Sequence, residues 1–273
     1  MPIPGRSHRL SIGPTAFALA FFFFELFIAV RAETAVEKGH TIAARSDRSD
    51  RGFGDSVVDL TMVLRNAAGQ ESVRTLTIKT LEIPDESVGD KILVVFDDPK
   101  DIDGTALLSH VKILEPDNQW LYLPALKRVK RIASVNKSGP FVGSEFAFED
   151  LTVLELEKYD YQWLRQEQLD GLNMDVVERY PRYENSGYSR QVSWIDQDIH
   201  QIRKVEFYGR RGDMQKTLQL LDYRNYGGIW RTHRMVMTNH RSGKSTDLIY
   251  DAYRFGIGLD DADFAKGALR RVR

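Results

Sequence analysis

The sequence predicts a mainly β protein with a few helices, whose antiparallel sheet curves strongly into a half-barrel around an apolar cavity. From Asp55 onward apolar residues recur with a period of two, the period of a β-strand. Many of these strands alternate charged with apolar residues, as in antiparallel sheets that have one face toward water. Roughly nine to eleven strands of this kind need cover on their apolar face, yet few segments have a helical pattern. A large sheet with sparse, short helical cover is expected to curl around a hollow.

The N-terminus has the pattern of a secretory signal peptide. Arg6 and Arg9 precede an apolar run from about residue 16 to residue 30, and small residues follow it. The run is shorter than the roughly 20 residues that a membrane-spanning helix needs, and Glu25 interrupts it. We therefore expect this segment to direct export and then to be cleaved.

Cleavage after Ala32 would remove residues 1–32 and leave residues 33–273 as a single domain. The chain contains no cysteine, so we expect neither a disulfide nor lipidation of an N-terminal cysteine. Residues 1–32 hold three of the 38 basic and one of the 39 acidic residues, which leaves 35 basic and 38 acidic residues and a formal charge of −3. Nucleic acid is not an expected partner, because its binding depends on a clearly basic surface.

The expected strands follow one another along most of the domain. Asp170 and Gly171 form the strongest two-residue hairpin turn in the sequence. Period two predicts strands over residues 55–66, 71–83, 91–98, 119–123, 161–169, 172–180, 189–198, 201–211, 215–226, 229–241 and 245–256. Helices are expected over residues 33–49, 99–110, 140–152 and 259–273, the last with Asp residues early and Arg residues late.

Four motifs resemble the outer membrane lipoprotein-sorting proteins, which share the LolA-like fold. They are EKGHTIAARSDRSDRGFGD (residues 37–55), FDDPKDIDGTALL (96–108), QWLYLPALKRVKRI (119–132) and NKSGPFVGSEFAFEDL (136–151). The chain is most similar to the branch that is often encoded beside exporters of the resistance-nodulation-division (RND) type. This resemblance implies a monomeric periplasmic carrier or chaperone that binds lipoprotein acyl chains or other lipid for transfer toward the outer membrane. It implies an RND-type exporter as partner, and neither a cofactor nor a metal.

The segment from residue 117 to residue 151 supplies the expected ligand-binding residues. Period two places Trp120 and Tyr122 on one face of a strand and Leu121 and Leu123 on the other, so that one pair can line a cavity. We expect the aromatic pair to do so, together with aromatic residues that follow. The expected cavity residues are Trp120, Tyr122, Phe141, Phe146 and Phe148.

Between these aromatic residues lie a basic cluster and a glycine-punctuated stretch. A rim where cations meet lipid phosphate or a partner's carboxylates would suit the cluster, and a solvated strand face would suit it equally. The cluster consists of Lys127, Arg128, Lys130 and Arg131. The stretch that follows is compatible with a mobile apolar flap or with a buried turn, because its backbone is broken by Gly139, Pro140 and Gly143.

Signals for catalysis are weak. The chain has no cysteine, its histidines lie at no ligand-like spacing, and neither H-E-x-x-H nor G-x-S-x-G occurs. Ser138 and Ser144 are the remaining nucleophile candidates, because acidic residues lie in the same segment, namely Glu145, Glu149 and Asp150. We therefore expect no enzyme. A lipid-ester hydrolase and a non-transporting accessory subunit of an exporter are the alternatives to a carrier.

Overall fold

The computed structural model describes residues 1–2, 33–85 and 87–271. Contacts divide the chain into two units, Met1–Ala32 and Glu33–Arg273, and the second unit contains all of the helices and strands described below. The expected signal peptide therefore lies outside the described residues, apart from Met1 and Pro2. The boundary between the units coincides with the expected cleavage point.

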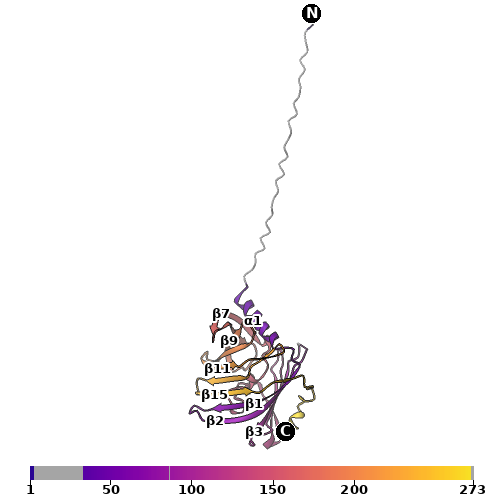
Figure 1. The fold of residues 1–273 in the computed structure, drawn as a ribbon, viewed down its shortest axis with the longest axis vertical. Coiled ribbons are helices and arrows are strands. Elements are labelled where there is room, and N and C mark those ends of the chain that lie inside the picture. The colour runs from indigo at the N-terminus through magenta and orange to yellow at the C-terminus, as the bar shows by residue number, and fades with distance from the viewer. Residues whose placement is uncertain (3–32, 86, 272–273) are drawn as a thin grey trace. The chain divides into compact units, whose positions relative to one another are not determined.

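The second unit is built on one large antiparallel sheet (Figure 1). Its strands are β1 (Asp55–Arg65), β2 (Glu71–Leu81), β3 (Lys91–Asp98), β4 (Ala106–His110), β5 (Asn118–Leu123), β6 (Arg128–Ile132), β7 (Tyr159–Leu169), β8 (Leu172–Pro181), β9 (Tyr188–Asp196), β10 (Ile202–Gly209), β11 (Met214–Leu221), β14 (Arg234–Asn239), β15 (Lys244–Tyr250) and β16 (Arg254–Phe255). A separate two-stranded sheet pairs β12 (Arg224–Tyr226) with β13 (Ile229–Arg231).

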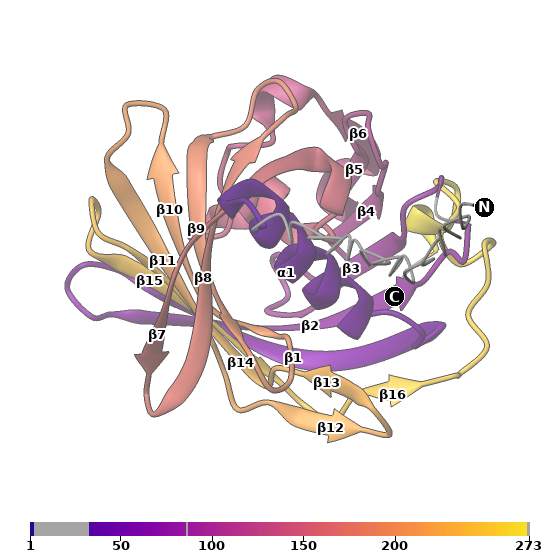
Figure 2. The same ribbon diagram turned by 90° about the horizontal axis from the view of Figure 1, so that it is seen from above.

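The order of strands in the large sheet explains its shape. From one edge to the other it runs β6-β5-β4-β3-β2-β1-β15-β14-β11-β10-β9-β8-β7, with β16 beside β1. Within β1–β6 and within β7–β11 each strand pairs with its sequence neighbours, whereas β14 pairs with β11 beyond the separate β12–β13 sheet, and β15 joins β1. Two meanders therefore meet at the β1–β15 pair. Figure 2 shows that the sheet is strongly curved and that β6 and β7 lie apart, as the two edges of the strand order. The expected half-barrel fold is confirmed.

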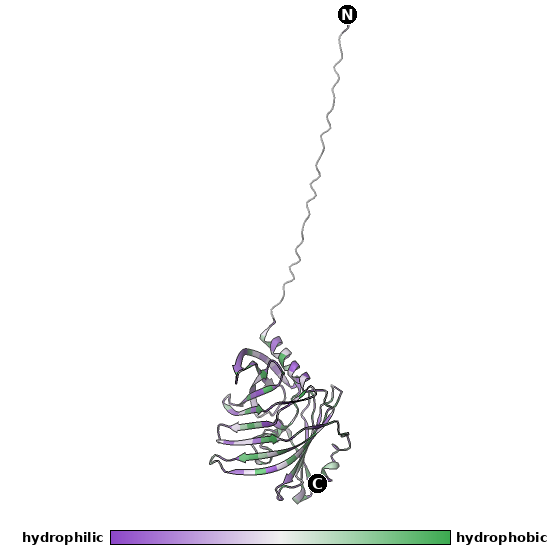
Figure 3. Cartoon of the chain, in the orientation of Figure 1, coloured by the Kyte–Doolittle hydropathy of each residue, from purple (hydrophilic) through white to green (hydrophobic). Residues whose placement is uncertain are grey.

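The two faces of the sheet bury different side chains (Figure 3 shows the alternation in hydropathy along the strands). On β3, Val94 and Phe96 belong to the main core, which lies on the concave face. Leu93 and Val95 point the other way and pack under the C-terminal segment, with Phe264 and Leu269. Period two therefore produces two apolar faces in this half of the sheet, and the chain covers the outer face with its own C-terminus.

The single α-helix among the described residues is α1 (Ala35–Ser49), which confirms the expected N-terminal helix. Its first turn is fixed by a capping box, in which Thr34 Oγ1 accepts from Glu37 N and Thr34 N donates to Glu37 Oε2. Gly39 lets the helix approach β7 closely, since a Cβ there would lie 2.6 Å from the backbone nitrogen of Trp163. Ile42 packs behind it with the aromatic residues of β7.

A second covering element is a segment without regular secondary structure, residues 137–151, which we call the plug segment. It contains the 3-10 turns η3 (Phe141–Gly143) and η4 (Phe148–Leu151) and lies against the concave face. The other 3-10 turns are η1 (Pro124–Leu126), η2 (Ser134–Asn136), η5 (Leu156–Lys158) and η6 (Ala268–Arg270).

Three expected helices are wrong. Residues 99–110 form a turn followed by β4, because the backbone of Ala106–His110 pairs with both β3 and β5. Residues 140–152 form only short 3-10 turns, since Val142 and Gly143 take positive φ angles. The described part of residues 259–273 contains turns and η6 alone. The Asp170–Gly171 hairpin is confirmed, with φ angles of 51° and 80° that suit a tight turn.

Candidate functional site

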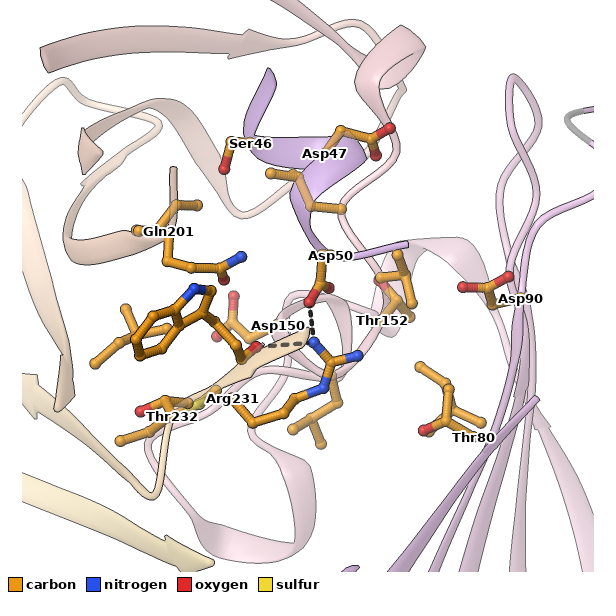
Figure 4. A pocket seen from close by; sticks show the side chains of 18 of the residues that line it. Ser46, Asp47, Asp50, Thr80, Asp90, Asp150, Thr152, Gln201, Arg231 and Thr232 are labelled. Atoms are coloured by element: carbon orange, nitrogen blue, oxygen red, sulfur yellow. Dashed lines mark hydrogen bonds and ion pairs between the residues drawn. The ribbon is translucent and has the colours of Figure 1, made fainter. Parts of the chain in front are cut away.

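The concave side of the sheet contains a cavity of about 370 Å³. The C-terminal half of α1 closes it from one side, and strands from both meanders form its walls (Figure 4). The strands line the cavity with residues from the same end of the sheet, along the strand direction. On β2, for example, Ile78 lines the cavity, whereas Arg74 donates to the carbonyl oxygen of Val142 in the plug segment. On β14, Met235 lines the cavity, whereas Asn239 donates to Glu145.

The space on the concave side of the sheet, which we call the hollow, is thus divided into two parts along the strand direction. We call the part occupied by the plug segment the filled end, and the part beside the C-terminal half of α1 the open end. The plug segment fills its end with aromatic side chains, since Phe141 stacks on Phe96 with ring centroids 5.6 Å apart and meets Phe148 edge-on. The open end leaves apolar surface uncovered.

The walls of the open end expose mainly apolar surface, from both aliphatic and aromatic side chains. Many of these side chains are only half-buried, because part of their surface faces the cavity rather than other protein atoms. The aliphatic ones include Ile78, Ile92, Leu154, Leu156, Leu220 and Met235. A cavity of this size, with apolar walls and a few polar groups, has the usual properties of a small-molecule binding site.

Seven charged residues also line the cavity: Asp47, Asp50, Arg51, Asp90, Asp150, Arg179 and Arg231. Arg51 pairs with Asp47, their Nε and Oδ2 atoms lying 2.9 Å apart, and its Nη2 lies 3.5 Å from Glu155. Arg231 pairs with Asp50, as Figure 4 shows, and its guanidinium lies over the ring of Phe53. Most of this charge is therefore neutralised locally.

The Asp50–Arg231 pair lies at the C-terminal end of α1. Asp50 lines the cavity and keeps 52% of its side-chain surface open. Desolvation raises the pKa of Asp50, against the opposing effect of Arg231. The pair links the helix to β13 across the open end.

Two further carboxyl groups near this helix end are held away from water. Burial raises the pKa of Asp90 to about 6, although Asp90 accepts a hydrogen bond from the Ile83 backbone. Burial also raises the pKa of Glu155 to about 7, and its Oε2 has no hydrogen-bond partner among the described residues. Arg51 lowers both values, but it does not offset the desolvation.

Asp150 lies at the base of the plug segment. The Tyr188 hydroxyl donates to both of its oxygens at 3.0 Å, and the Ala147 backbone donates to Oδ2 at 2.7 Å. Lys216 Nζ lies 3.9 Å from the same oxygen. Burial still raises the pKa of Asp150. These bonds hold Asp150 as a structural anchor of the segment.

The structure separates the expected cavity residues into three places. Phe146 lines the cavity. Phe141 and Phe148 belong to the adjoining core of the filled end. Trp120 and Tyr122 pack on the opposite face of the sheet, under Phe264 and Leu269 in the C-terminal segment, whereas Leu121 packs on the concave side. The expectation that the Trp120 and Tyr122 pair lines the cavity is therefore corrected, because the covered outer face is apolar as well.

The basic cluster lies at the β6 edge and outside the cavity lining. Arg131 is opposite Trp120 and Lys130 is opposite Leu121, so neighbouring charges point to different faces of the strand. Lys127 ends η1 in a left-handed conformation. All four residues of the cluster are exposed, and none forms an ion pair within the described part of the chain.

The glycine-punctuated stretch forms a turn in which Phe141 is buried, whereas Pro140 and Gly143 are exposed. Glu145 alone receives hydrogen bonds from Lys216 and Asn239 and donates its backbone N–H to Thr246, so three strands hold it. These hydrogen bonds hold the stretch against the concave face, and its mobility stays an open expectation.

No catalytic arrangement is formed around the two serines. Ser144 is buried and donates to the carbonyl oxygen of Phe146 at 3.3 Å. Within residues 33–85 and 87–271, neither Ser138 nor Ser144 is hydrogen-bonded to a histidine or a carboxylate. The same residues contain no group of three potential metal ligands. Nor does any helix among them have the length and hydropathy to cross a membrane.

The sequence reasoning missed the lining residues of α1 and the charged residues of the cavity. One signal could have indicated a charged cavity residue, namely a charged side chain at a position where the alternation of the strand predicts an inward-facing residue. In β8, Val177 faces the concave core, so Arg179, two residues later, points the same way.

Fold and cavity together define a class of protein, a half-barrel protein with an interior cavity of about 370 Å³. Three solved structures have the same architecture. An outer membrane lipoprotein-sorting protein domain from Vibrio parahaemolyticus is 48% identical, with a TM-score of 0.84, and the match covers 86% of this chain and 100% of that one. A DUF1329 family protein from Desulfovibrio piger is 29% identical over 86% of this chain and 99% of that one, with a TM-score of 0.82.

The chain therefore belongs to the outer membrane lipoprotein-sorting protein family, with the LolA-like fold. A LolA superfamily protein from Nitrosomonas europaea shares the fold with a TM-score of 0.68 at 20% identity, over 84% of this chain and 98% of that one. Residues 89–271 also match a family model described as "-like: Uncharacterized protein". No curated protein matches the sequence.

Proposed function

We propose that the protein is a periplasmic carrier or chaperone that binds lipoprotein acyl chains or another lipid in its cavity for transfer toward the outer membrane. The observation that carries the proposal is the open end, a cavity of about 370 Å³ with half-buried apolar walls in a member of this family. Each methylene buried there would contribute about 0.8 kcal/mol to binding. The export signal expected in residues 1–32 supports a periplasmic location.

Phe146 is the expected site residue that would contact such a lipid, with Phe141 and Phe148 supporting it from the filled end. The exposed basic cluster would dock the carrier on anionic lipid or on an acidic partner surface. We propose an RND-type exporter as that partner, on the basis of the sequence resemblance. Hydrolysis is the less favoured function, because neither serine contacts a base.

Lipid binding is tested by filling the cavity. Leu220→Trp places a larger apolar side chain at a half-buried cavity position, so we expect saturable binding of a fluorescent fatty acid to weaken at least about tenfold. Ile249→Trp is the matched control, because Ile249 is exposed on β15 beside the inward Leu248. Lipid extracted from the purified wild-type protein and identified by mass would separate a carrier from an accessory subunit. Equal binding by wild type and Leu220→Trp would contradict the proposal.

A further inference from the structure

The cavity contains one buried cation without a carboxylate partner among the described residues. Arg179 is 8% exposed and lines the cavity. Its Nε donates to Gln191 Oε1 at 2.7 Å, and its guanidinium lies over the ring of Tyr159. Of the three cavity arginines, Arg51 and Arg231 form ion pairs with described residues, and Arg179 forms none.

Two hydroxyl groups on neighbouring strands, those of Tyr161 and Ser193, lie on the same face of the sheet as Arg179. Tyr161 on β7 is directly opposite Arg179, and Gln191 on β9 is directly opposite it on the other side. Ser193 follows Gln191 on the same face, is 2% exposed, and its Oγ has no hydrogen-bond partner in the described residues. The Tyr161 hydroxyl lacks one as well in this part of the chain, and both residues line the cavity.

The carboxylate that faces this group is already engaged. Asp150 accepts hydrogen bonds from Tyr188 and Ala147 and lies near Lys216. No hydrogen bond or ion pair joins Asp150 to Arg179 within the described residues, although the positive charge of Arg179 lowers the pKa of Asp150. The two Nη groups of Arg179 have no hydrogen-bond acceptor among the described residues, and a buried charge without an ion-pair partner is costly. An anionic acceptor in the cavity would supply both.

We propose that the cavity binds a single-chain amphiphile whose anionic head group, a carboxylate or a phosphate, is held inside by Arg179. Since Nε is occupied by Gln191, the two Nη groups remain for a bidentate contact with two oxygens of the head group. Tyr161 and Ser193 would donate to the same oxygens. The tail would lie along the apolar walls.

This inference rests on the proposed function and narrows it. An acyl chain of a lipoprotein ends in an uncharged methyl group, which would leave Arg179 without a partner. A free lipid acid would satisfy both the apolar walls and the arginine. The cargo class that fits the described cavity is therefore a single-chain lipid acid with its head group inside.

The test compares head groups on one chain length. Dodecanoate, dodecyl phosphate and dodecanol compete with the neutral dye N-phenylnaphthylamine for the wild-type protein. We expect the preferred anion to displace the dye at about 10- to 100-fold lower concentration than the alcohol, because a charge-assisted hydrogen bond has that effect on affinity. The ratio between carboxylate and phosphate identifies the head group.

Arg179→Met should reduce this preference to less than about threefold. Arg165→Met is the control and should keep the preference, because Arg165 is exposed on β7 and lies outside the cavity lining. Arg179→Lys keeps the charge but not the planar guanidinium that allows a bidentate contact, so it should retain only part of the preference. This variant replaces Arg179→Met in the test if a thermal melt shows that the methionine variant does not fold. An anion preference that survives in Arg179→Met, or is absent from the wild type, overturns the inference. Failure of all three compounds to displace the dye instead contradicts the proposed function itself.

Discussion

The filled end and the open end of the hollow are built on the same strands but in different ways. At the filled end, Phe96 on β3 meets Phe141 of the plug segment. At the open end of the same strand, Ile92 faces the cavity. At the filled end, rings therefore pack on one another, whereas the open end combines half-buried aliphatic, aromatic and charged side chains around the cavity.

The largest difference between the two ends should appear in their stability. Phe141→Ala removes a side chain that is 1% exposed between two other rings, so we expect the free energy of unfolding to fall by about 3 to 5 kcal/mol. Leu154→Ala at the open end should cost less than about 2 kcal/mol, because Leu154 already faces a cavity. Urea denaturation measures both. Equal losses would mean that the two ends are packed equally well.

A smaller effect concerns pH at the open end. The folded-state pKa of Glu155, about 7, lies above its ordinary value of 4.5, so the folded protein binds this proton more tightly than the unfolded chain. Its contribution is complete below about pH 4.5 and is lost as the pH rises toward 7. We expect the free energy of unfolding to fall by about 1 to 2 kcal/mol over this range, after allowance for solvent screening. Asp90, with a pKa of about 6, acts in the same direction.

Glu155→Gln should flatten this pH dependence and make the protein more stable than wild type at pH 8, as measured by urea denaturation at several pH values. Glu157→Gln is the control, because Glu157 is an exposed neighbour. A pH profile of Glu155→Gln that is indistinguishable from wild type would show that Glu155 is solvated in solution.

The smallest effect on stability is expected outside both ends, on the β6 edge. Neutralising Arg128 and Arg131 together should change the free energy of unfolding by less than about 1 kcal/mol, because both side chains are exposed. If the basic cluster docks on an anionic surface, the double variant should transfer lipid to anionic vesicles more slowly at low salt, with little change at high salt. If the double variant transfers lipid at the wild-type rate at low salt, the cluster does not dock the protein and is only a solvated face.

Much of the fold could be predicted because it depends on local patterns. Period two indicates the strands, and the Asp170–Gly171 turn indicates the tightest hairpin. The helix expected over residues 99–110 is wrong because β4 forms through pairing with β3 and β5, which no local pattern records. The expected strands over residues 215–226 and 229–241 are each broken, since the chain leaves the sheet near Asp222, at a positive φ angle, to form β12 and β13.

The candidate site was harder to predict for a physical reason. Period two indicates that Trp120 and Tyr122 share a face, but both faces of that half of the sheet are covered. Which of them is concave depends on the sheet's curvature, and Phe264 and Leu269 cover the other one from the far end of the chain. Glycine weakens a helix in isolation, whereas Gly39 permits the contact of α1 with β7.

The unpaired edges β6 and β7 make the molecule unevenly stiff. No ladder of hydrogen bonds joins these two described edges, so the radius of the sheet is set by what crosses the hollow. At the filled end, hydrogen bonds from the plug segment reach β2, β11, β14 and β15 and act as a crossbar. At the open end, the direct polar links across the hollow are few, with the Asp50–Arg231 pair foremost among those described. The described domain is therefore cross-linked more heavily at the filled end than at the open end, and we expect the open end to deform more easily.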